Sequence, residues 1–162
     1  MASTKVIVDS AKGLYQQSSA SGGFEVGVDV PIVIDSDLTV NGMTSLDKVS
    51  ETYVSLSGAT GVVVHDCSTG HIFYHTTPAA NWTANLTNLN LADGFATSVT
   101  CVIAQGGTAR IPSAVQIGGA AQTLYWQGNV QPSGTANRRD VVSFSILNVG
   151  GVYTVLGQLV SF

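Results

Sequence analysis

The C-terminal two thirds of the chain have almost no charge. Residues 52–162 contain three Asp, three Arg and neither Lys nor Glu, so about 5% of these positions are charged. Soluble domains usually carry about 25%. Residues 1–51 hold ten charged side chains with a net charge of −4. We therefore predict an N-terminal attachment arm (1–51) followed by a β domain (52–162), and we expect the charge-poor domain to associate with copies of itself.

Other absences exclude several classes of protein. The basic residues form no cluster except Arg138-Arg139, so we expect no nucleic-acid binding. No apolar run approaches 18 residues, and Met1 to Lys5 lack the hydrophobic stretch of a signal peptide. We thus expect neither membrane insertion nor export. Cys67 and Cys101 are the only cysteines, and we interpret both as reduced core thiols rather than a disulfide framework.

Short runs with a period of two, broken by Gly, Pro or Asn, predict an all-β fold. The predicted class is an antiparallel β-sandwich, jelly-roll-like, of about eight strands, with an extended N-terminal β arm. A helix of one or two turns fits only Ser45 to Val54. The predicted strands of the domain are Gly61 to Asp66, His71 to Thr76, Thr83 to Leu91, Ala96 to Ala104, Ala114 to Ile117, Gln122 to Gln127, Val141 to Leu147 and Val152 to Gln158.

The arm divides into two parts. Its first 23 residues are polar and cannot bury enough surface to fold alone. They contain two apolar strips, Val6-Ile7-Val8 and Leu14-Tyr15, which we predict to dock on a partner. From Phe24 to Val40 the alternation predicts strands, and Asn41-Gly42 is a strong hairpin signal.

One cluster has metal-ligand residue types: His65, Asp66, Cys67, His71 and His75. His71 and His75 would lie roughly 13 Å apart on one strand face, too far to hold one ion. A hairpin after Cys67 could bring His65 closer, and a three-fold axis could gather one histidine from each chain. The favoured interpretation is local hydrogen bonding on a sheet face, without metal.

Motifs for catalysis are absent. No Gly-x-Ser-x-Gly elbow occurs, and the diglycines fit β-turns rather than phosphate cradles. Asp35 and Asp37 could pair for glycoside cleavage but lie on the arm without an aromatic cleft, so we interpret them as solvated. Arg138-Arg139-Asp140 is interpreted as a surface or intersubunit ion pair. We predict no catalytic residue, no cofactor and no enzymatic activity.

The aromatic residues allow two interpretations. Trp82, Tyr125, Trp126 and Tyr153 could form a sugar-stacking platform. Tyr125 and Trp126 face opposite sides of one strand, so at most one of them can be exposed there. The favoured interpretation is packing, and the predicted residues of the core or an interface are Trp126, Leu124, Trp82, Phe144 and Tyr153.

Several phrases in the second half resemble a β domain of tailed-phage virion proteins, notably of phages of marine cyanobacteria. They are Asn81 to Leu89, Gly107 to Gly119, Tyr125 to Gly128, Gln131 to Asn137, Asp140 to Ile146 and Gly151 to Gly157. The resemblance covers roughly Gly58 to Leu159. Leu38 to Leu46 is similar to a phrase from the shafts of trimeric phage fibres. Gly118 replaces an Asp that is frequent in the family.

The resemblance implies a non-enzymatic virion protein, assembled in the host cytoplasm. We expect a homotrimeric short fibre, a neck or baseplate appendage, or a capsid decoration, which docks on another virion protein through its arm. The alternative is a module that binds glycans of the host surface. A depolymerase is the third and least favoured possibility.

Overall fold

A computed structural model describes residues 5–9, 13–17 and 43–162 of the chain. These residues belong to two compact units, 1–46 and 47–162. In the first unit, β1 (Lys5–Asp9) pairs antiparallel with β2 (Gly13–Gln17), and Ile7 lies opposite Tyr15. Short strands were predicted for the arm, but between Phe24 and Val40 rather than here. This ladder contains both apolar strips proposed for docking. The strands and turn predicted between Phe24 and Gly42, and with them Asp35 and Asp37, lie outside the described residues.

The second unit contains ten strands and one short 3-10 turn. The elements are β3 (Tyr53–Ser57), β4 (Gly61–Asp66), β5 (Ile72–Thr76), β6 (Trp82–Thr87), β7 (Ala96–Ala104), β8 (Pro112–Ile117), β9 (Ala120–Gln122), β10 (Leu124–Trp126), η1 (Gln127–Asn129), β11 (Arg139–Val149) and β12 (Val152–Ser161). The prediction of an all-β chain is confirmed for this unit. The helix considered for Ser45 to Val54 is wrong, because these residues lead into β3.

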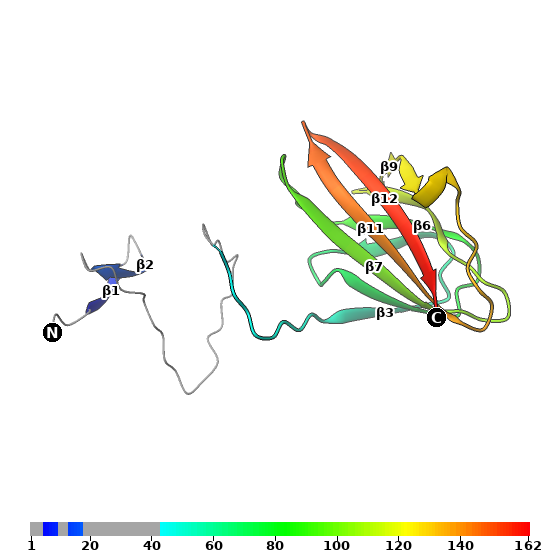
Figure 1. The fold of residues 1–162 in the computed structure, drawn as a ribbon, viewed down its shortest axis with the longest axis horizontal. Helices are drawn as coiled ribbons and strands as arrows, with labels where there is room; N and C mark the ends of the chain where they lie inside the picture. Colours follow the sequence, from blue (N-terminus) through cyan, green and yellow to red (C-terminus); the bar gives the residue numbers. More distant parts are fainter. Residues whose placement is uncertain (1–4, 10–12, 18–42) are drawn as a thin grey trace. The chain divides into compact units, whose positions relative to one another are not determined.

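The strands form two mixed sheets, ordered β10-β12-β11-β7-β5-β3 and β4-β6-β8-β9. From β3 to β8 the chain enters the other sheet at each step, so β3, β5 and β7 run parallel in one sheet and β4, β6 and β8 in the other. The predicted antiparallel arrangement is therefore wrong for most of the ladders. It holds for the β11–β12 hairpin, closed by Gly150-Gly151 at positive φ, for β7 beside it (Figure 1), and for β8 with β9.

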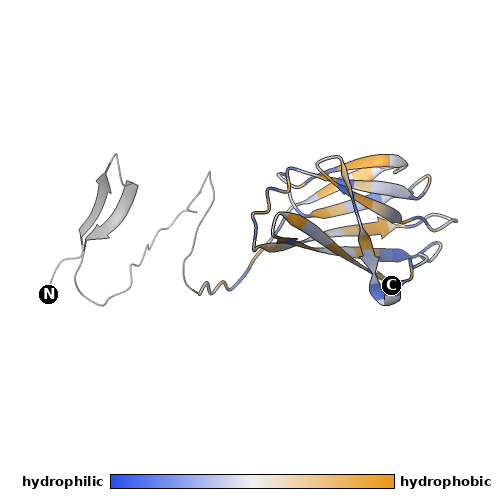
Figure 2. Cartoon of the chain, turned by 90° about the horizontal axis from the view of Figure 1, so that it is seen from above, coloured by the Kyte–Doolittle hydropathy of each residue, from blue (hydrophilic) through white to orange (hydrophobic). Residues whose placement is uncertain are grey.

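The two sheets share one hydrophobic core. Burial alternates along the strands, as in β6, where Trp82, Ala84 and Leu86 are buried and the residues between them are not. Phe73 of β5 and Phe144 of β11 supply further buried rings from the six-stranded sheet. Hydrophobic stretches mark the strands of this unit in Figure 2. Cys67 and Cys101 are buried and free, in agreement with the prediction of core thiols.

Asp140 of β11 is fully buried, which corrects its interpretation as part of a surface ion pair. Its carboxylate accepts hydrogen bonds from Gln105 Nε2 at 2.7 Å, Thr135 N at 2.9 Å and Ser161 Oγ at 2.6 Å. Gln105 Nε2 also donates to the backbone O of Arg110, and Gln105 Oε1 accepts from the backbone N of Arg110. A buried carboxylate needs such donors because its desolvation is costly. The network fastens two loops to the ends of β11 and β12.

Candidate binding surface and buried histidine pair

The outer face of the six-stranded sheet presents an apolar row across four strands. Tyr74 lies opposite Val102, Val102 opposite Val141, and Val141 opposite Val160. The alternate residues of these strands are buried in the core, so this apolar row faces away from it. Val160 is 43% exposed. Tyr74, Val102 and Val141 are half-buried, so the row forms a continuous apolar band that is partly open to water in a single chain.

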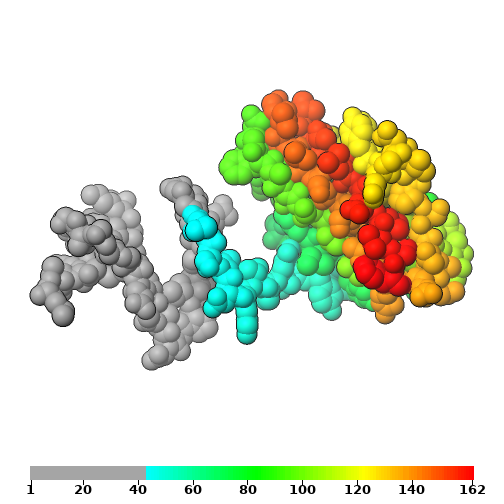
Figure 3. Space-filling model, viewed as in Figure 1, coloured from blue at the N-terminus to red at the C-terminus, as the bar shows by residue number. Residues whose placement is uncertain are grey.

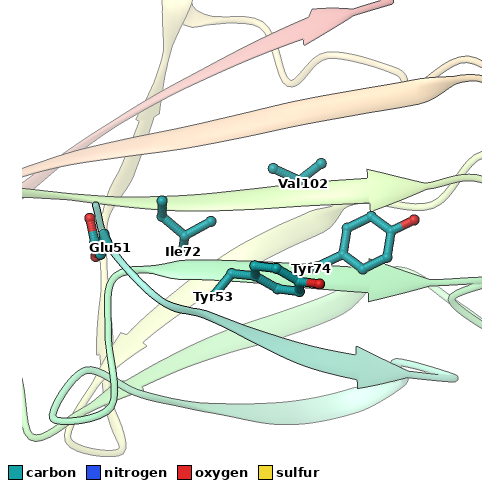
Figure 4. A pocket seen from close by; sticks show the side chains of 5 residues that line it. All are labelled: Glu51, Tyr53, Ile72, Tyr74 and Val102. Carbon is teal, nitrogen blue, oxygen red and sulfur yellow. The ribbon is translucent and has the colours of Figure 1, made fainter. Parts of the chain in front are cut away.

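A groove of about 250 Å³ lies at the β3 end of this face and is lined by Glu51, Tyr53, Ile72, Tyr74 and Val102. Figure 4 shows Tyr53, Tyr74, Ile72 and Val102 on the neighbouring strands β3, β5 and β7, and Glu51 on the segment that leads into β3. The Tyr53 and Tyr74 rings meet edge to face, with centroids 6.1 Å apart, and Tyr53 is 64% exposed. Glu51 accepts a hydrogen bond from the backbone N of His71 at 2.7 Å. This groove, called the Tyr53 groove below, extends the apolar row and offers apolar walls to aromatic or aliphatic side chains.

A second hollow of about 380 Å³, the Tyr125 groove, lies around β10 and β12. In Figure 3 these segments, yellow and red, lie side by side at the surface. Tyr125 is half exposed there. The hydrogen-bonding side chains of the lining are Gln127, Ser143, Ser145 and Gln158. An aromatic ring beside several amides and hydroxyls is the chemistry that binds a sugar.

The face has little charge to desolvate. Of all residues in the six strands, only Arg139 and the buried Asp140 are formally charged. A partner that covers the apolar row would therefore have few ionised groups to desolvate, namely Arg139 at one end of β11 and Glu51 in the neighbouring groove, and desolvating charge is the main cost of burying a polar surface.

The sugar-stacking platform of Trp82, Tyr125, Trp126 and Tyr153, which was the alternative to packing, does not form. Trp82 and Trp126 are buried, whereas Tyr125, which lies between Leu124 and Trp126 on β10, is exposed. Phe144 is buried, and Leu124 and Tyr153 pack against the core. The Trp126 indole lies over Gly157 of β12, where a Cβ atom would come within 2.8 Å of the ring. Glycine at this position lets the indole pack flat on the sheet.

A buried pair of histidines joins the two sheets. Nε2 of His65, on β4, lies 2.9 Å from Nε2 of His75, on β5. Both side chains are fully buried, and Cys101 Sγ of β7 lies 3.8 Å from His65 Nε2. Of the five residues with metal-ligand types, the structure brings His65 and His75 together with Cys101, whereas Asp66, Cys67 and His71 do not belong to this group. His71 instead contacts Thr97 Oγ1, at 3.2 Å from Nδ1.

The core environment favours the neutral forms of these groups. Burial lowers the pKa of His65 to about 4, against the Nδ1 hydrogen bond to Val63 O, which raises it. Burial and the neighbouring His65 lower the pKa of His75 to about 4. Burial raises the pKa of the Cys101 thiol to about 12. The pair is therefore a neutral hydrogen bond at physiological pH.

The grooves depend on contacts between strands that are not consecutive in sequence, and the histidine pair depends on two consecutive strands that lie in different sheets. The runs GVVVHD and IFYHT do not alternate apolar and polar residues, so the sequence shows neither that His65 and His75 face inward nor that they meet. Within the described residues, no helix is long and apolar enough to cross a membrane. No protein-family model, curated protein or solved structure matches the chain.

Proposed function

We propose that this chain is a non-enzymatic structural protein of a phage virion that acts as a homotrimer. Its two sheets form a β-sandwich knob, jelly-roll-like in outline, whose six-stranded face packs against copies of itself. The observation that carries the proposal is the apolar row Tyr74–Val102–Val141–Val160 on a face with almost no charge. Burying such a row contributes roughly 25 cal/mol per Å² of apolar surface.

The grooves beside the row support the same function. Side chains of a neighbouring copy can enter the Tyr53 groove, where two tyrosines and Ile72 offer apolar walls. Aromatic residues in such pockets are frequent energetic centres of interfaces. A symmetric assembly would also cover exposed valines of a domain that has little charge to keep copies apart.

A lysine on the apolar row is the most direct test of this face. Val141→Lys places a charge at the centre of the row, on the outer side of β11, and we expect it to convert the trimer into monomers that still fold. The matched control is Val64→Lys, because Val64 is 55% exposed on the outer face of the other sheet. Light scattering measures the mass of both variants in solution, and only Val141→Lys should have the mass of a monomer. A trimer that persists in Val141→Lys would place the interface elsewhere.

We further propose that the arm attaches the protein to another virion protein. The β1–β2 ladder carries Val6, Ile7, Val8, Leu14 and Tyr15. Deleting residues 1–23 should leave the melting temperature and the oligomeric state unchanged and should abolish incorporation into particles. Particles assembled with the truncated chain are analysed by gel, beside full-length protein. Normal incorporation of the truncated chain would contradict the proposal.

A module that binds host-surface glycans is the second candidate function. The Tyr125 groove favours it, because an exposed ring there lies beside Gln158, Ser143 and Ser145. In this case the knob would be the outermost part of a fibre or appendage, and removing the Tyr125 ring would abolish cell binding without affecting the fold. The proposed structural role predicts no such loss.

A further inference from the structure

The proposed function makes no use of the polar cluster in the centre of the core. His65, His75 and Cys101 come from β4, β5 and β7, and each is 0% exposed. One ligand atom from each, a ring nitrogen or the sulfur, lies within 4.8 Å of the others. Moving two imidazoles and a thiol from water into a hydrophobic core costs free energy. One hydrogen bond between the two rings offsets only a small part of that desolvation cost.

The hydrogen bonds of the pair leave one nitrogen without a partner. Val63 O can only accept, so the neutral His65 ring carries its proton on Nδ1, 3.0 Å from that oxygen. His65 Nε2 is then an acceptor, and His75 must donate from its own Nε2. This leaves His75 Nδ1 bare, and no hydrogen-bond partner lies beside it. The hydrogen bonds of the neutral pair therefore do not satisfy all of its ring nitrogens, and His75 is held through Nε2 alone.

We propose that His65 Nε2, His75 Nε2 and Cys101 Sγ bind one Cu⁺ ion. Soft thiolate ligands with imidazoles select Cu⁺ or Zn²⁺. Zn²⁺ requires a fourth ligand and would leave a net positive charge in the core, since the cluster contains no carboxylate. Cu⁺ with one thiolate and two neutral imidazoles has no net charge. Cys67 stays outside the set, with its Sγ 3.7 Å from His65 O.

The proton balance of binding is simple and involves no redox step. The Cys101 S–H bond breaks and its proton goes to solvent, while one Cu–S and two Cu–N bonds form. The His75 proton moves from Nε2 to Nδ1, and His65 keeps its Nδ1–H bond to Val63 O, which orients the ring as second hydrogen bonds orient metal-bound histidines. With metal–nitrogen bonds of about 2.0–2.1 Å, trigonal geometry separates the two nitrogens by roughly 3.5 Å. The rings must therefore part slightly from 2.9 Å.

Because the site is closed to solvent, the ion has to enter before the sheets close, and binding is coupled to folding. The experiment accordingly refolds the full-length, reduced chain without oxygen, with or without one equivalent of Cu⁺, and then adds a competing Cu⁺ chelator. We expect one copper per chain after chelation and a higher melting temperature than that of the metal-free protein. Cys101→Ala and His75→Gln should each lose stoichiometric copper, whereas Cys67→Ala should retain it.

X-ray absorption of the copper-loaded wild-type protein makes the test independent of whether the variants fold. One sulfur and two nitrogens around copper are expected. No retained copper, copper retained equally by Cys101→Ala, a coordination shell without sulfur, or loading by Zn²⁺ in preference to Cu⁺ would each overturn the assignment.

Discussion

Metal-free protein is expected to lose stability steeply as the pH falls from about 6.5 to about 4. Burial lowers the folded-state pKa of His65 and His75 from 6.5 to about 4. Above pH 6.5 both histidines are neutral in the folded and in the unfolded chain, so their titration does not reduce the free energy of unfolding. Below it the unfolded chain binds protons first, so the free energy of unfolding decreases until the folded pKa is reached. One histidine with this shift removes about 3 kcal/mol, a large part of a typical margin of about 5–15 kcal/mol.

Denaturant unfolding at a series of pH values measures this loss. His75→Gln removes one of the two coupled groups and should flatten the decrease between pH 6.5 and 4. His71→Gln is the matched control, because His71 lies outside the pair and contacts Thr97. A wild-type free energy of unfolding that stays constant over this range would contradict the buried neutral pair.

Replacing Trp126 by Ala is expected to cost about 3–5 kcal/mol, the usual range for a buried large aromatic residue. The Trp126 indole is 8% exposed and packs on Gly157 of the neighbouring strand. Its ring also lies 6.4 Å from that of Phe144. The variant should melt at a much lower temperature or aggregate. The melting temperature is measured by circular dichroism of the backbone, because this signal does not depend on the tryptophan that is removed.

Two further variants make the Trp126 test specific. Gly157→Ala places a methyl group against the same ring and should also destabilise the domain. Tyr125→Ala removes the exposed neighbour and should melt almost normally. If Tyr125→Ala also abolishes binding to host cells, the glycan-binding alternative gains its support. If Trp126→Ala melts at the wild-type temperature, the indole does not contribute to the stability of the domain, and the prediction is wrong.

The sequence predicted where strands lie better than how they pair. β4 and β7 have the predicted bounds, because runs of β-forming residues and the turn residues that end them are local signals. The segment Ser68 to Gly70 has the length and composition of a hairpin turn. It nevertheless carries the chain from one sheet to the other, since β4 pairs with β6 and β5 with β3 and β7. Partner choice depends on packing across the core, which no local pattern contains.

The same limit applies to the candidate sites. The sequence placed His65 and His75 on sheet faces, but GVVVHD and IFYHT have no period of two that would assign them to the inward side, and their contact requires the two sheets to face each other. Cys101 joins them from 36 residues away. Asp140 follows two arginines and so suggested an ion pair, although Gln105, Thr135 and Ser161 are its partners in the fold. The apolar row arises only from the registers of four strands.

The mass of the wild-type protein in solution tests the central proposal most directly. Light scattering of the full-length chain at micromolar concentration should give three times the mass of one chain, with no change on moderate addition of salt, because the proposed interface is apolar rather than ionic. A monomer mass under these conditions would contradict a homotrimer built on the outer face of the six-stranded sheet.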